Sequence, residues 1–209
     1  CVIVSGAGRA FCAGHDLAEM RAMPGREEQL ALFSQCSSVM QAIIACPVPV
    51  IAQVHGIGTA AGCQLAASCD LAIAATSSRF AVSGINVGLF CSTPAVALTR
   101  AVGPKQAFDM LFTGEFISAD QACERGLVNR VADDDALDAE LATLIDSILA
   151  KPRVAVAMGK ELFYRQAELG IAAAYETVGQ TMACNMMDEA ALEGVQAFLE
   201  KRKARWGQE

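Results

Sequence analysis

The sequence has little positive charge and no long uninterrupted apolar run. Its 16 lysines and arginines are outnumbered by 23 aspartates and glutamates, and the formal charge is −7. Because phosphate binding needs clustered positive charge, a general nucleic-acid-binding protein is excluded and any anionic ligand must be held locally. Apolar runs such as Pro47 to Val54 end well short of the roughly 20 residues that a spanning helix needs. We therefore expect a soluble protein without membrane association.

Metal-ligating patterns are also missing. The 9 cysteines include no CxxC pair, and the 2 histidines, His15 and His55, have no His/Cys cluster around them. Zinc sites and redox couples need such spacings, so we expect no protein-bound metal. Most cysteines are expected to be small buried residues in a reducing compartment, the cytoplasm or, in a eukaryote, the mitochondrial matrix.

What is present is enough apolar sequence for a packed core. The chain has 209 residues, of which 54% are hydrophobic and 19% charged. Apolar strands are predicted at residues 2–5, 48–54 and 71–75, with helices at 17–23, 29–45 and 60–69 between them. This alternation of strands and helices predicts an α/β fold.

After Gly88 the pattern indicates helices alone. They are predicted at residues 94–102, 105–112, 118–126, 136–150, 152–168, 172–187 and 189–204. We therefore expect a mixed α/β core over residues 1–130 and a helical region over residues 131–209. The Met- and Ala-rich faces of the later helices suit packing between subunits.

Two glycine-rich segments must be weighed as nucleotide fingerprints. The segment from Gly6 places Phe11 where a small third residue belongs, so the match fails. The segment Gly56-Ile57-Gly58-Thr59-Ala60-Ala61 fits better, but no acidic residue stands about 20 positions later to bind a ribose. A dinucleotide-binding enzyme remains a minor alternative.

The same Ala- and Gly-rich helix start could instead bind an anion. Small side chains let a ligand approach the backbone, and the first turn of a helix offers unpaired N–H groups. Such donors would stabilise negative charge on a thioester oxygen during enolate formation. The alternative is that the small residues merely allow close packing of the helix on the sheet.

Six ordered sequence blocks resemble the enoyl-CoA hydratase/isomerase (crotonase) family. They are Ala10-Phe11-Cys12-Ala13-Gly14-His15-Asp16-Leu17-Ala18-Glu19-Met20, Pro49-Val50-Ile51-Ala52-Gln53-Val54-His55-Gly56, Ala61-Gly62-Cys63-Gln64-Leu65-Ala66, Cys69-Asp70-Leu71-Ala72-Ile73-Ala74, Thr113-Gly114-Glu115-Phe116-Ile117-Ser118-Ala119 and Phe198-Leu199-Glu200-Lys201-Arg202-Lys203. The resemblance implies a crotonase-like spiral of ββα units with a helical C-terminal trimerisation region, assembled as a homotrimer or hexamer. It also suggests that the family's N-terminal part is missing before Cys1.

The resemblance further implies an acyl-CoA substrate and no separate cofactor. By position, the backbone amides of His15 and Ala61 would bind the thioester oxygen. Ala13, His15, Asp16 and Leu17 would meet the CoA moiety. Lys201 would approach the nucleotide from a neighbouring subunit, although a charged run at a helix end is more often only solvated.

The chain departs from the family at the two acid/base positions. Where family hydratases carry glutamates, this sequence has Gln64 and Gly84. An amide takes no proton near neutrality, and glycine has no side chain, so we expect weak hydration of crotonyl-CoA. The carboxylates Glu19, Asp70 and Glu115 lie in matched blocks, but they are expected to support the structure.

Two alternatives remain open. The segment Gly14-His15-Asp16 resembles methylmalonyl-CoA decarboxylases of the same family, in which His15 would be the catalytic group, although the tyrosine of those enzymes is replaced by Cys91. His15 could instead only pack or cap a turn. The second alternative to an enoyl-CoA hydratase or isomerase is a non-catalytic acyl-CoA-binding protein.

Overall fold

The expected apolar strands pair into a parallel sheet. In the computed structural model, which describes residues 1–23 and 25–206, this sheet has the order β1-β2-β4-β7. Its strands are β1 (Val2–Ser5), β2 (Val50–Val54), β4 (Leu71–Ala75) and β7 (Arg130–Ala132). Ile51 and Ile73 on one face and Ala52 and Ala74 on the other are all 0% exposed. Burial of both faces explains why β2 and β4 are almost continuously apolar.

A second, smaller sheet carries the loops of the candidate site. It consists of β3 (Ile57–Thr59), β5 (Arg79–Ala81) and β6 (Ile117–Ser118), with β3 parallel and β6 antiparallel to β5. An isolated bridge pairs Cys12 with Gly58. The glycine-rich segment 57–59 is therefore a short strand, and its pairing holds the chain around Cys12.

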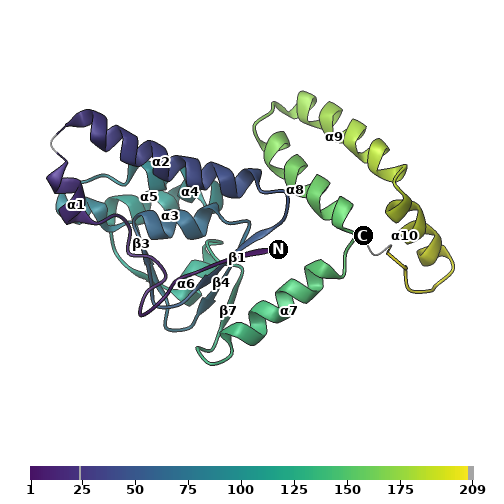
Figure 1. Ribbon diagram of the computed structural model, residues 1–209, viewed down its shortest axis with the longest axis horizontal. Helices are drawn as coiled ribbons and strands as arrows, with labels where there is room; N and C mark the ends of the chain where they lie inside the picture. Colours follow the sequence, from purple (N-terminus) through teal and green to yellow (C-terminus); the bar gives the residue numbers. More distant parts are fainter. Residues whose placement is uncertain (24, 207–209) are drawn as a thin grey trace. The chain divides into compact units, whose positions relative to one another are not determined.

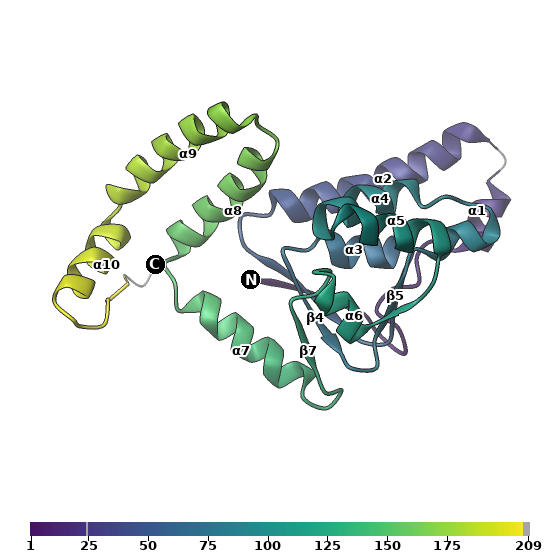
Figure 2. The same ribbon diagram turned by 180° about the vertical axis from the view of Figure 1, so that it is seen from behind.

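Helices gather on one side of these strands, as both views show for α2 to α5 (Figures 1 and 2). A buried cluster including Val54, Cys63, Phe80, Leu98 and Met110 fills the space between the elements. The helical segments of this part are α1 (Leu17–Ala22), α2 (Arg26–Ala45), α3 (Ala61–Ser68), the 3₁₀ turn η1 (Ser83–Val87), α4 (Ser92–Ala101), α5 (Pro104–Thr113) and α6 (Ala119–Glu124).

The chain divides into two compact units. The first comprises Cys1–Cys46 and Val50–Ala142, and the second comprises Pro47–Pro49 and the chain from Thr143 onward. Helix α7 (Leu137–Leu149) runs from one into the other, and α8 (Arg153–Ala167), α9 (Ile171–Met186) and α10 (Glu189–Leu199) belong to the second. Within the second unit, Lys160 Nζ donates a hydrogen bond of 3.0 Å to the carbonyl of Val48.

The helices follow the predicted pattern closely, whereas the short strands do not. Helices alone are predicted after Gly88, but β6 and β7 also lie there, and β7 pairs with β4 inside the first unit. Strands of two or three residues are too short to show a period in the sequence. The expectation that most cysteines are buried is also wrong, because three of the nine are buried, four are half-buried and two are exposed.

No helix in the described part of the chain combines the length and the apolar character needed to cross a membrane.

Candidate active site

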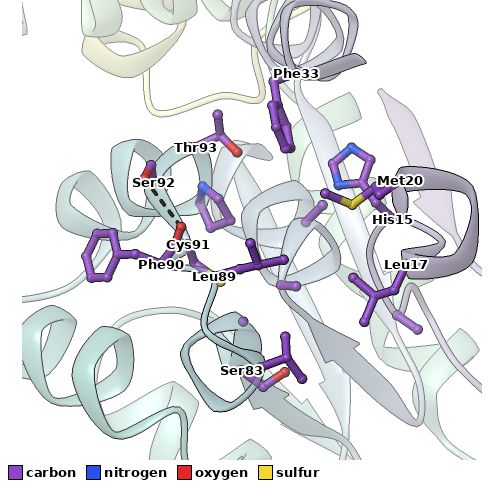
Figure 3. A pocket seen from close by; sticks show the side chains of 16 residues that line it. His15, Leu17, Met20, Phe33, Ser83, Leu89, Phe90, Cys91, Ser92 and Thr93 are labelled. Carbon is purple, nitrogen blue, oxygen red and sulfur yellow. Dashed lines mark hydrogen bonds between the residues drawn. The ribbon is translucent and has the colours of Figure 1, made fainter. Parts of the chain in front are cut away.

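A cavity of about 420 Å³ lies in the first unit (Figure 3). His15, Leu17 and Met20 line one side of it in this view, and Phe90 and Ser92 lie on the opposite side. Its walls come from the loop before α1 and α1 itself, from α2, from the start of α3, and from η1, the following loop and the start of α4. The lining residues are Ala13, His15, Leu17, Met20, Phe33, Ala60, Ala61, Ser83, Gly84, Val87, Leu89, Phe90, Cys91, Ser92, Thr93 and Pro94.

The sequence folds the loop before His15 against the start of α3. The amide of Cys12 donates to the carbonyl of Ile57 (3.1 Å), and the amide of Thr59 donates to the carbonyl of Cys12 (3.0 Å). Gly62 is needed here because a Cβ at this position would collide with the Cys12 carbonyl. This close approach brings residues 13–15 beside Ala60 and Ala61.

The two amides that the resemblance assigns to the thioester oxygen lie next to the same cavity. A Cβ built on Gly14, the residue before His15, would stand 3.4 Å from the backbone nitrogen of Ala61. Both His15 and Ala61 line the cavity. Within residues 1–23 and 25–206, neither amide donates to a protein acceptor. Ala61 is the first residue of α3, where helix N–H groups have no intrahelical partner.

The backbone at Ala60 is strained. Its φ of 50° and ψ of −117° lie in a region that L-residues rarely adopt. The amide of Ala60 is held by the carbonyl of Ala81 at 3.0 Å, which fixes this conformation from β5. The strained residue orients the peptide whose nitrogen belongs to Ala61.

We expect the substitution Ala60→Gly to raise the free energy of unfolding by about 1 kcal/mol. Relief of strain of roughly 1–3 kcal/mol outweighs the extra unfolded-state entropy of glycine, roughly 0.5–1 kcal/mol. Urea unfolding would measure the difference. The matched control is Ala173→Gly, inside α9 and exposed, which should lower the free energy of unfolding by roughly 0.5–1 kcal/mol. An equal loss in both variants would contradict the assignment of strain to Ala60.

The polar side chains at the cavity are few. The His15 ring packs edge-on against Phe33, with 5.7 Å between ring centroids and an interplanar angle of 84°. The hydroxyls of Ser83 and Thr59 share a hydrogen bond of 2.9 Å, and Ser92 Oγ donates to the carbonyl of Phe90 at 3.3 Å. An imidazole and several hydroxyls therefore line an otherwise apolar cavity, and the described residues that line it include no carboxylate.

Gln64 is buried behind the cavity and is not among the residues that line it. It is 4% exposed, and its Oε1 accepts a weak hydrogen bond from Cys36 Sγ at 3.9 Å. Neighbouring Cys63 is fully buried, and burial raises the pKa of its thiol to about 12.

Gly84 lines the cavity, but the structure leaves no room for a side chain there. A Cβ would lie 2.6 Å from the carbonyl oxygen of Leu89 and 2.8 Å from Cys91 Sγ. Cys91 is 8% exposed, and burial raises the pKa of its thiol. Leu89 and Cys91 therefore occupy the space that a side chain at residue 84 would need.

The residues that the resemblance assigns to CoA lie in both compact units: Ala13, His15, Asp16 and Leu17 in the first, and Lys201 in the second. Ala13, His15 and Leu17 line the cavity, while the Asp16 carboxylate caps α1 by accepting from the amides of Ala18 (2.8 Å) and Glu19 (3.4 Å). Lys201 lies in the second unit, just after the C-cap of α10, with a φ of 55°. Its role toward a nucleotide stays a prediction.

Among the other candidate carboxylates, that of Asp70 has a structural partner. Asp70 Oδ2 accepts from the amide of Val50 at 2.6 Å, which joins the loop before β4 to the start of β2.

The described residues contain no group of three or more His, Cys, Asp or Glu side chains placed to hold a metal ion.

Sequence reasoning missed the apolar side of the cavity. Phe33 on α2 and the segment Val87 to Phe90 line it, although they carry no motif. The sequence signal that could have found this segment is its apolar run Val87-Gly88-Leu89-Phe90. In the structure, Val87, Leu89 and Phe90 remain 60%, 47% and 43% exposed, as is common at binding surfaces.

Comparisons with known proteins agree on one family. A family model described as enoyl-CoA hydratase/isomerase matches residues 1–209. A crystal structure of an enoyl-CoA hydratase from Mycobacterium smegmatis is 64% identical, with a TM-score of 0.96 over 98% of this chain and 80% of that chain. The mouse mitochondrial enoyl-CoA hydratase domain-containing protein 3 is 47% identical over 98% of this chain and 68% of its own length. A crotonyl-CoA hydratase from Syntrophomonas wolfei is 33% identical over 98% of this chain and 79% of its own length.

Proposed function

Since the chain belongs to the enoyl-CoA hydratase/isomerase family and is an acyl-CoA-processing enzyme of that kind, we propose that its cavity binds the thioester group between the amides of His15 and Ala61. The observation that carries this proposal is the adjacency of Gly14 and the Ala61 nitrogen beside a largely apolar cavity. Two N–H groups aimed at one oxygen stabilise the negative charge that develops there when an enolate forms.

The acyl-CoA enters as substrate, and the proposal includes no separate cofactor. Backbone around Ala13, Asp16 and Leu17 would meet the CoA moiety, and Lys201 would approach its phosphates from a neighbouring subunit of a trimer or hexamer. A charged side chain supplied locally suits a protein whose net charge is −7.

A reducing compartment is part of the proposal. All nine cysteines are free, which suits the cytoplasm. The mitochondrial matrix is the alternative, because relatives such as the mouse protein are named mitochondrial.

We expect this protein to hydrate crotonyl-CoA about 10²- to 10⁴-fold more slowly than family members that carry both carboxylates. A factor of this size is the rate enhancement that general acid/base catalysis contributes, and neither Gln64 nor Gly84 supplies a general acid or base. Steady-state hydration of crotonyl-CoA, with the Syntrophomonas wolfei crotonyl-CoA hydratase as reference, would measure it. Turnover equal to the reference would contradict the loss of the acid/base pair.

Binding separates the proposal from its alternatives. Calorimetry should show binding of acetyl-CoA and none of NAD. Binding of NAD alone would overturn the acyl-CoA assignment in favour of a dinucleotide enzyme. Binding of CoA esters without turnover of any of a broad set would identify a non-catalytic acyl-CoA-binding protein.

Decarboxylation is the second candidate reaction, and it is favoured by the His15 imidazole at the cavity wall. In it, the bond between Cα and the carboxylate breaks, CO₂ leaves, the electron pair forms the enolate, and Cα then takes a proton. No base is needed to start this reaction. Undiminished activity of His15→Ala on malonyl-type thioesters would exclude His15 as the proton donor.

A further inference from the structure

One wall of the cavity continues into an exposed aromatic surface. Phe90 lines the cavity, and its ring lies 5.2 Å from that of Phe112 at an interplanar angle of 56°. Phe112 in turn stacks on Phe108, with 3.9 Å between centroids and an angle of 12°. Figure 3 shows the Phe90 ring on the side of the cavity away from His15. We call Phe90, Phe112 and Phe108 the aromatic ramp.

The aromatic ramp leads to a second depression on α5. This depression of about 470 Å³ is lined by Phe108 and Phe112 together with Lys105, Asp109 and Thr113. Both depressions lie within the first compact unit. Phe90 therefore joins them, since it lines the first and its ring packs on the aromatic lining of the second.

The core does not require these rings. Helix α5 buries its other face through Ala107, Met110 and Leu111, while Phe108 and Phe112, four residues apart, remain 61% and 51% exposed. Phe90 is 43% exposed. Exposed apolar surface of this kind is typical of surfaces that bind a ligand, a membrane or another protein.

We propose that the aromatic ramp binds the distal part of a long acyl chain whose thioester lies in the cavity, so that the preferred substrates are long-chain acyl-CoAs. This rests on the proposed function, which places the thioester near His15 and Ala61. From there an acyl tail that follows the apolar wall leaves the cavity past Leu89 and Phe90. Continuity of the ramp with the cavity favours the acyl tail over a protein partner.

Chain-length dependence of affinity is the direct consequence. Each methylene buried on an apolar surface adds up to about fourfold in affinity. A short acyl group ends inside the cavity and gains nothing from the ramp, whereas a long one gains at every methylene laid on the rings.

The test compares saturated acyl-CoAs of 4, 8, 12 and 16 carbons by calorimetry below their micelle-forming concentrations. The unmodified protein should bind the longest ester at least about 100-fold more tightly than butanoyl-CoA, given the gain per methylene. In Phe108→Ser/Phe112→Ser, affinity for the longest ester should fall at least about tenfold while affinity for butanoyl-CoA stays within about twofold. The matched control, Phe163→Ser on α8, removes a phenylalanine that is 66% exposed and should change neither value.

Other outcomes would overturn the proposal. Equal affinities for all chain lengths would show that the tail does not follow the ramp. If the double variant keeps its chain-length dependence but sediments as a smaller species than the unmodified protein, the ramp is covered by a second copy of the chain. Failure of butanoyl-CoA and the longer esters alike to bind would instead contradict the proposed function.

Discussion

Substitution of Ala61 by proline, in an Ala60→Gly background, is expected to lower turnover of the preferred acyl-CoA about 10²- to 10³-fold without unfolding the protein. Loss of one oxyanion donor has this effect in enzymes that stabilise such charge through backbone amides. Proline removes the N–H of Ala61 and is compatible with the first position of a helix. The chain already uses proline there, since Pro104 begins α5.

The Ala60→Gly background is needed because a proline ring crowds the side chain of the preceding residue. At a φ of 50° and a ψ of −117°, the Ala60 Cβ would be exposed to that clash, and glycine removes it. The reference protein is therefore Ala60→Gly alone. A second control is Glu189→Pro at the first position of α10, whose N-cap Asp188 has extended backbone. It should leave turnover unchanged.

A spectroscopic readout does not depend on which reaction the enzyme performs. The thioester carbonyl of bound, isotope-labelled acetyl-CoA should shift to lower stretching frequency when two N–H groups polarise it. In the proline variant this shift should become smaller while acetyl-CoA still binds, because only the His15 amide then polarises the carbonyl. An unchanged carbonyl frequency and unchanged turnover would show that the Ala61 amide does not bind the thioester oxygen.

The elements that the sequence predicts well are those whose local pattern agrees with their packing. The strands 2–5 and 71–75 have their predicted limits, because buried parallel strands are continuously apolar. Helix α2 begins at Arg26, three residues earlier than predicted, where the first turn is polar. The strands β3, β5, β6 and β7 span three residues or fewer, so only pairing with distant segments defines them.

The sequence predicts the backbone donors of the candidate site but not the contacts that bring its parts together. The motifs around His15 and Ala61 pointed to backbone donors, but only folding places Gly14 beside the Ala61 nitrogen. The aromatic ramp joins residues 90, 108 and 112 from two segments, and no local pattern links them. Likewise, the resemblance to the family implies that Gln64 stands where a catalytic carboxylate is expected, but it cannot show that this side chain is buried against Cys36.

Restoring a carboxylate by Gly84→Glu is expected to destabilise the protein and to leave crotonyl-CoA hydration weak. The new Cβ would lie 2.6 Å from the carbonyl oxygen of Leu89, which is backbone and cannot rotate away. Residues 84 and 89 are also tied together, because the Leu89 amide donates to the Gly84 carbonyl at 3.0 Å. Overpacking of this kind costs roughly 1–3 kcal/mol of unfolding free energy. The segment that must move to relieve it carries the cavity wall at Leu89, Phe90 and Cys91.

Three further variants separate the effect of the added Cβ from that of the carboxylate and from that of the Cys91 side chain. Gly84→Ala adds the Cβ without the carboxylate and should show most of the destabilisation in urea unfolding. Gly84→Glu combined with Cys91→Ala removes the clash with Sγ but keeps the one with the Leu89 carbonyl, so it should recover only part of the stability. Gly179→Ala in α9, where a Cβ meets nothing within 4 Å, should stabilise the helix by roughly 0.5–1 kcal/mol.

If Gly84→Glu were as stable as the unmodified protein and hydrated crotonyl-CoA at least about 10²-fold faster, the missing carboxylate alone would account for the weak hydration. The packing of residues 89–91 against Gly84 would then have no part in it.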